Sequence, residues 1–185
     1  MAKRQSKVKP TWEAVKAEFV GFDRAALLAV LQDLYSVSEG NQAFLHARFS
    51  LGQNPLQPYK KTIDQWLRPD TLRGKGTSAS RAKRAISDYR LASGDPEGLA
   101  ELMVYYCEQA AGFCRNADYQ DAAYLDALVR MFEQALRTTT DAGNSVALRA
   151  RLLGRLDRVR TVGRELGYGI GDDMDVLFAE FVSSC

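Results

Sequence analysis

Histidine is almost absent from this 185-residue chain, which contains a single one, His46. A histidine that acts as a general base needs a partner that orients it, and zinc or di-iron sites need clustered ligands. Arg48 follows two positions later and would point elsewhere on a helix, and no Glu-x-x-His pair occurs. The sequence therefore predicts no catalytic residue and no metal site, and we interpret His46 as a surface or boundary residue.

Cysteine and long apolar runs are scarce as well. Cys107 and Cys114 lie seven positions apart in a predicted helix, which is roughly 10 Å and too far for a disulfide. The third cysteine, Cys185, is terminal. No apolar run approaches the roughly 20 residues of a membrane helix, and no apolar segment of a signal peptide follows the basic N-terminus. These absences predict reduced thiols, a cytoplasmic location and no membrane segment.

A nucleotide-binding loop is missing too. Residues 74–78 read Gly-Lys-Gly-Thr-Ser, whereas the Walker pattern requires Gly, four residues, and then Gly-Lys-Ser/Thr after a strand. One alternative stays open, because the free N–H groups at the start of the following helix, together with Lys75 and Arg81, could hold a phosphate. No cofactor is predicted.

Helical periodicity is what the sequence does contain, and it is strongest between Asp95 and Arg137. Asp95 is a typical N-cap before Pro96, and apolar residues then recur at helical spacing as far as Cys114. Asp118 is expected to cap a second helix, in which an apolar stripe lies opposite a charged one. The short connection predicts that the two helices are antiparallel neighbours.

Shorter helical segments surround this hairpin, and the sequence shows no convincing strand. One of them follows Asp23, and the residues that are expected to face inward from it are Leu27, Val30, Leu31, Leu34 and Tyr35. We predict an all-α protein in which residues 11–185 form a single domain after a basic flexible tail, residues 1–10. Its seven to nine helices would form a bundle or a short solenoid-like domain around the central antiparallel hairpin.

Charge is balanced over the chain, with a formal net charge of +2, but it is unevenly distributed. Residues 59–90 contain nine basic and three acidic side chains, residues 95–133 contain eight acids and two arginines, and residues 146–166 contain six arginines and two acids. Either these blocks pair with one another inside the domain, or they form a basic surface for nucleic acid or an acidic partner. The residues that would contact phosphate or nucleic acid are Lys60, Lys61, Arg73, Lys75, Arg81, Lys83 and Arg84.

Several short segments carry a resemblance to a known family. They are Leu-Gln-Asp-Leu-Tyr at 31–35, Phe-Leu-His-Ala-Arg-Phe at 44–49, Tyr-Lys-Lys-Thr-Ile at 59–63, Ala-Ile-Ser-Asp-Tyr at 85–89, and Leu102-Met103 with Tyr105-Tyr106. The pattern resembles an uncharacterised family of small prokaryotic proteins, a domain of unknown function, over most of the chain after residue 23. The resemblance implies a helical bacterial protein and brings no activity, cofactor or catalytic residues.

No acid–base pair, no nucleophile with a base and no metal cluster is visible in the sequence. We therefore predict a non-enzymatic protein-interaction or regulatory domain with an unidentified protein partner. Nucleic-acid binding through residues 59–90 is the alternative, and an enzyme of unrecognised class is the third hypothesis. The sequence leaves the oligomeric state open.

Overall fold

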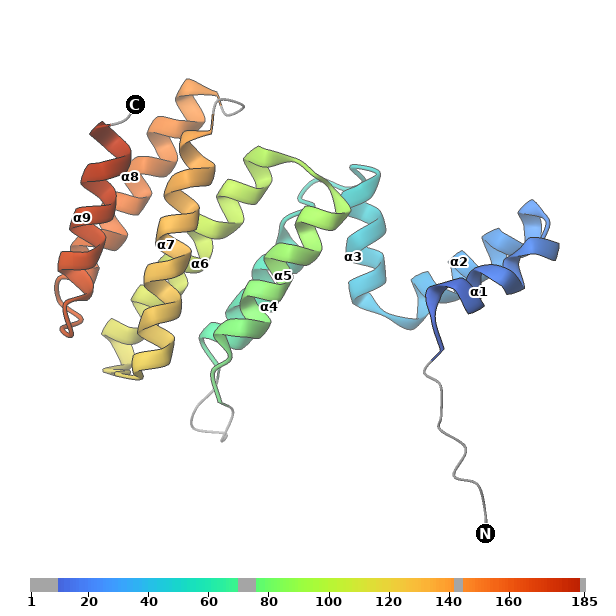
Figure 1. Ribbon diagram of the computed structural model, residues 1–185, viewed down its shortest axis with the longest axis horizontal. Helices are drawn as coiled ribbons and strands as arrows, with labels where there is room; N and C mark the ends of the chain where they lie inside the picture. The colour runs from blue at the N-terminus through green and yellow to red at the C-terminus, as the bar shows by residue number, and fades with distance from the viewer. Residues whose placement is uncertain (1–9, 70–75, 142–144, 184–185) are drawn as a thin grey trace, which may run out of the picture. The chain divides into compact units, whose positions relative to one another are not determined.

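The computed structural model describes residues 10–69, 76–141 and 145–183. In these ranges the chain is all-α, as its periodicity predicts, with nine α-helices, one short 3-10 helix and no strand (Figure 1). The chain divides into two compact units, Met1–Gln42 and Ala43–Cys185, whereas the sequence predicts a single domain over residues 11–185. The boundary falls within α3 (Glu39–Arg48), and each unit is described by itself below.

The larger unit contains six complete helices. They are α4 (Gln57–Leu67), α5 (Ala79–Ala92), α6 (Pro96–Ala117), α7 (Ala122–Thr140), α8 (Val146–Gly163) and α9 (Ile170–Ser183). Each helix packs on the next in sequence, α4 and α8 also pack on α6, and α7 packs on α9. Consecutive helices are antiparallel, so α4, α6 and α8 form one layer and α5, α7 and α9 the other (Figure 1). This alternation is that of a short solenoid, in which each helix meets its near neighbours in sequence.

The predicted central hairpin consists of α6 and α7. Asp95 caps α6 by accepting hydrogen bonds from the N–H groups of Glu97 and Gly98, both at 3.0 Å. The prediction for the cap of α7 is wrong, because α6 continues to Ala117 and Asp118 ends it in the left-handed conformation, with φ 47°. Asp121 caps α7 instead, and its Oδ1 accepts a hydrogen bond from the N–H of Tyr124 at 2.8 Å.

The hydrophobic core is centred on this hairpin. Ten of the 22 residues of α6 are buried, as expected for a helix that packs against four neighbours. Cys107 and Cys114 are among them, and both are free thiols. Burial raises the pKa of the Cys114 thiol to about 11, with Asp121 adding to the effect, and burial raises that of Cys107 further. Both cysteines therefore stay protonated and pack as small apolar side chains.

The smaller unit contains α1 (Trp12–Glu18), the 3-10 helix η1 (Phe19–Gly21) and α2 (Arg24–Val37). Thr11 caps α1 and Asp23 caps α2. No side chain of α1, η1 or α2 is buried. The expectation that the apolar stripe of α2 faces inward is therefore wrong for this unit. The physical reason is that α1, with seven residues, packs chiefly on η1 and does not cover α2.

Candidate interaction surfaces

Among the described residues that the sequence assigns to a phosphate-binding surface, Lys60 and Arg81 make side-chain contacts within the protein. The Lys60 ammonium lies 3.4 Å from Glu101 and 5.0 Å from the centre of the Tyr105 ring. The Arg81 guanidinium lies over the Trp66 ring, 4.2 Å from its centre.

The other described cations of this set lie on α4 and α5. Lys61, Lys83 and Arg84 are exposed, and none of them forms an ion pair with another described residue. Lys83 and Arg84 are neighbours on α5 and point about 100° apart on the helix. Arg73 and Lys75 lie outside the described residues, so the phosphate site proposed at the start of α5 stays a prediction.

A row of polar contacts connects α4 to α6. Lys60 pairs with Glu101, the Tyr105 hydroxyl donates to Asp64 Oδ2 at 2.7 Å, and Arg68 Nη1 donates to Gln109 Oε1 at 2.6 Å. On each side of this row the contacting residues are four positions apart in the sequence, so successive contacts lie about one helical turn apart. We call this row, together with its continuation to α8 described next, the polar ladder.

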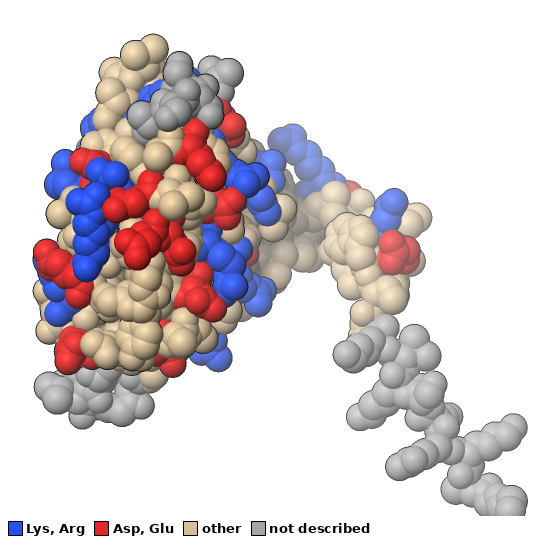
Figure 2. All heavy atoms as spheres, turned by 60° about the vertical axis from the view of Figure 1, so that its left-hand side comes forward, with Lys and Arg blue, Asp and Glu red and all other residues tan. Residues whose placement is uncertain are grey.

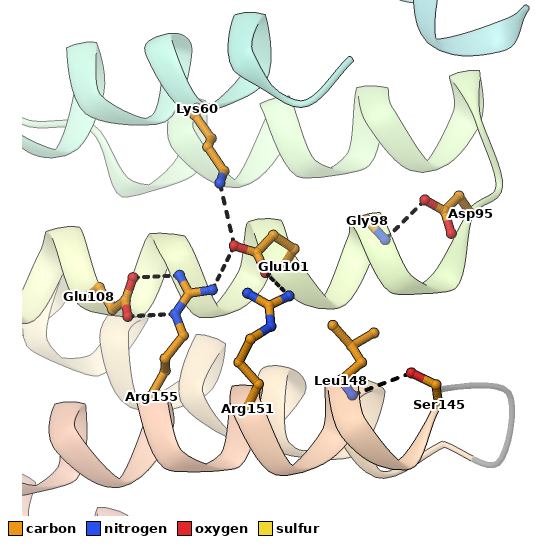
Figure 3. A network of polar contacts seen from close by, with 9 residues as sticks. All are labelled: Lys60, Asp95, Gly98, Glu101, Glu108, Ser145, Leu148, Arg151 and Arg155. Atoms are coloured by element: carbon orange, nitrogen blue, oxygen red, sulfur yellow. Dashed lines mark hydrogen bonds and ion pairs between the residues drawn. The ribbon is translucent and has the colours of Figure 1, made fainter. Parts of the chain in front are cut away.

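The polar ladder continues from α6 to α8 through two arginines (Figure 3). Arg155 binds both oxygens of Glu108, at 2.8 and 2.6 Å, and donates to Glu101 Oε1 at 2.6 Å. Arg151 donates to Glu101 Oε2 at 3.0 Å. Internal pairing between the acidic block and the two basic blocks of the sequence is thus confirmed for Lys60, Arg151 and Arg155.

Glu101 is the centre of this network, and its side chain is 13% exposed. Burial by itself raises the pKa of this carboxyl group. The hydrogen bond from Arg155 and the charges of Arg155, Lys60 and Arg151 together outweigh burial, so the pKa of Glu101 is lowered. Glu101 is therefore ionised at neutral pH with both oxygens engaged, and its role is to hold α4, α6 and α8 together.

Arginines of α8 also pair with α9, which leaves little unbalanced charge at that end. Arg164 binds both oxygens of Asp175 at 3.0 and 2.9 Å, and Arg160 lies 3.2 Å from the same carboxylate and over the Phe178 ring. On the face in Figure 2, basic and acidic side chains are intermingled and form no broad region of one sign. The third charge block of the sequence is therefore largely neutralised within the protein.

The chain matches no family model, no curated protein and no solved structure. The resemblance to an uncharacterised prokaryotic family therefore stays a prediction. Within the described ranges, no three ligand side chains are grouped so that they could hold a metal ion. No helix in those ranges combines the length and the apolar character that crossing a bilayer requires.

A groove of about 200 Å³ opens between α5, α6 and α7. It is lined by Lys83, Ile86, Ser87 and Arg90 of α5, Leu99 and Met103 of α6, and Met131 and Gln134 of α7. Lys83 is among the contact residues that the sequence predicts, whereas Arg90 is not. Their spacing of seven, which places both on one side of α5, is the signal that identifies Arg90.

Within the smaller unit, helix α2 has an apolar face that α1 and η1 leave uncovered. Leu27, Leu31 and Leu34 follow one another at intervals of four and three, which places them on one side of the helix. All three are exposed, Leu31 by 48%. We call this set the α2 apolar face. A surface of adjacent exposed leucines is typical of a protein–protein contact.

Proposed function

We propose that this protein is a non-enzymatic protein-interaction module that associates through its α2 apolar face, and that its partner there is a second copy of the chain. The observation that carries the proposal is the exposure of Leu27, Leu31 and Leu34 in a unit whose helices bury no side chain. An isolated helix of this length is marginal in water, and helices gain most of their stability by packing an apolar face. The face therefore favours association.

Three features favour a second copy as the partner. Most soluble assemblies are symmetric homo-oligomers in which one patch meets itself. Leucines at intervals of four and three provide the knobs and holes by which two such helices interdigitate. Charge does not oppose the pairing, because Arg24 and Asp33 are the charged residues of α2 and have opposite signs.

We expect the wild-type protein to sediment at twice the monomer mass at micromolar concentration, and Leu31→Glu to sediment as a monomer. The glutamate would bury an unpaired carboxylate in the pairing surface, which should weaken association by at least about 100-fold. The measurement is analytical ultracentrifugation, with circular dichroism as a check that helix content is kept.

Leu91→Glu is the matched control for this change. Leu91 is a leucine of α5 with 67% exposure, so the same substitution there should leave the mass of the assembly unchanged. A wild-type protein that stays monomeric throughout the micromolar range would refute self-association through α2.

Nucleic-acid binding is a second candidate, and a specific observation favours it. Five cations of α4 and α5 are exposed and form no ion pair with any residue that the structure describes: Lys61, Arg81, Lys83, Arg84 and Arg90. About five phosphate contacts would make affinity fall roughly 10²- to 10³-fold between 50 and 200 mM salt.

Fluorescence anisotropy with mixed single- and double-stranded oligonucleotides measures this dependence. Replacing Lys61, Lys83, Arg84 and Arg90 by glutamine should weaken binding uniformly across sequences. Arg115→Gln, at an exposed position of α6 outside the block, should have little effect. Absence of micromolar binding at low salt would remove this candidate.

A further inference from the structure

We infer that the groove between α5, α6 and α7 is a docking site for an acidic amphipathic helix of a partner protein. The groove belongs to the larger unit and shares no residue with the α2 apolar face. The inference therefore goes beyond the self-association proposed above and stands or fails independently of it.

The size of the groove favours side chains of a protein over a small-molecule ligand. Its volume of about 200 Å³ is below the roughly 300–1,000 Å³ of typical small-molecule pockets. One or two apolar side chains fill such a space. A groove flanked by two helices that do not close on each other is also the geometry in which proteins bind an amphipathic helix.

The floor of the groove is formed by apolar side chains, two of them methionines. Ile86, Met103 and Met131 form the buried part of it, and Leu99 is half-buried beside them. Methionine side chains adjust their shape to an incoming apolar group more readily than branched ones. Met103 is held at its sulfur, which accepts a hydrogen bond from the Thr138 hydroxyl at 3.4 Å.

The rim of the groove carries positive charge that no acidic residue of the described lining neutralises. Lys83 and Arg90 are separated by two turns of α5, roughly 10 Å by the helical rise, and Ser87 lies between them. Both cations are exposed, neither pairs with a described acid, and the described residues that line the groove include no Asp or Glu. Asp88 is the one acidic residue of α5. It lies five positions after Lys83 and two before Arg90, and residues at these spacings do not share a helix face, so Asp88 points away from both cations.

These features specify the partner helix. Two carboxylates seven residues apart match the spacing of Lys83 and Arg90, and apolar side chains at the third and fourth positions between them reach the methionine floor. A nucleic acid would use the two cations but would leave the apolar floor uncovered. The combination of rim and floor therefore favours a protein helix.

The test uses the full chain and a fluorescein-labelled helical peptide with glutamates seven residues apart and leucines between them. Binding should be micromolar, and Lys83→Glu combined with Arg90→Glu should weaken it about tenfold or more. Lys61→Glu combined with Arg84→Glu is the matched control, because both are exposed cations outside the groove. A peptide with lysines in place of the glutamates should bind the groove variant better than it binds the wild type.

Methyl-labelled methionine provides a second readout by NMR spectroscopy. Peptide binding should shift the methyl resonances of Met103 and Met131 but leave that of Met174 unchanged, because Met174 is fully buried beside Gly163 of α8. The inference is overturned if the peptide fails to bind at millimolar concentration, or if both double variants lose affinity equally. Displacement of the peptide by a short oligonucleotide that carries the same net charge as the peptide would also overturn the inference, in favour of a nucleic-acid surface.

Discussion

Replacing Phe132 with alanine is expected to lower the free energy of unfolding by about 3–5 kcal/mol. The Phe132 side chain has 0% exposure and lies in the middle of α7, between Leu128 and Leu136, which are buried as well. Alanine would leave a cavity at the α6–α7 interface, and the surrounding helices can relax into it only in part. Urea denaturation followed by circular dichroism measures the change.

Phe49→Ala is the matched control for Phe132→Ala. Phe49 is 65% exposed, so the same chemical change there should cost less than about 1 kcal/mol. A loss at Phe132 no larger than the loss at Phe49 would mean that the α6–α7 hairpin is not the organising core.

Glu101→Gln is expected to cost about 2–4 kcal/mol of unfolding free energy. The glutamine is neutral and places an amide NH₂ group among three cations, which leaves Arg155 with the Glu108 carboxylate alone. Glu133→Gln is the control, because Glu133 pairs with Arg137 one turn away on the exposed side of α7. Exposed i,i+4 pairs contribute a few tenths of a kcal/mol, so equal losses in the two variants would refute a central role for Glu101.

The pH dependence of the Glu101→Gln effect follows from the lowered pKa of Glu101. Folding lowers this pKa below its ordinary value of 4.5, so the stabilisation is complete above that value and is lost as pH falls through the folded-state pKa. The difference in unfolding free energy between wild type and Glu101→Gln should therefore shrink on acidification below about pH 5. A difference that stays constant with pH would show that the effect of the substitution is steric.

Local structure was predictable where neighbouring residues determine it. The hairpin of α6 and α7 follows from apolar periodicity and from the Asp95-Pro96 start, both of which act within a few residues. The cap of α7 was missed because Asp118 and Asp121 are chemically equivalent candidates. The choice between them depends on how far α6 continues, and packing against α4, α5, α7 and α8 determines that length.

The arrangement of helices and the candidate surfaces were less predictable, because they depend on contacts between distant residues. The spacing of Lys60, Asp64 and Arg68 is visible in the sequence, but each partner lies 41 residues later in α6. The apolar stripe of α2 is equally visible in the sequence, but the sequence pattern does not show whether another helix covers the stripe. The position of Arg90 at the rim of a groove could not be predicted from the sequence, because the opposite side of that groove is formed by Met131 and Gln134 of α7.

The polar ladder also restricts which compact states the chain can adopt while it folds. Helices held together by apolar contacts alone can slide past each other by one turn, about 5.4 Å, at modest cost. In this protein, sliding α4 by one turn in one direction brings Asp64 opposite Glu101, so that two carboxylates meet. Sliding it in the other direction moves Asp64 from Tyr105 to Gln109 and takes Lys60 away from Glu101, which loses one cation. Misaligned intermediates are thus penalised on both sides, and the chain reaches a single alignment of its first layer.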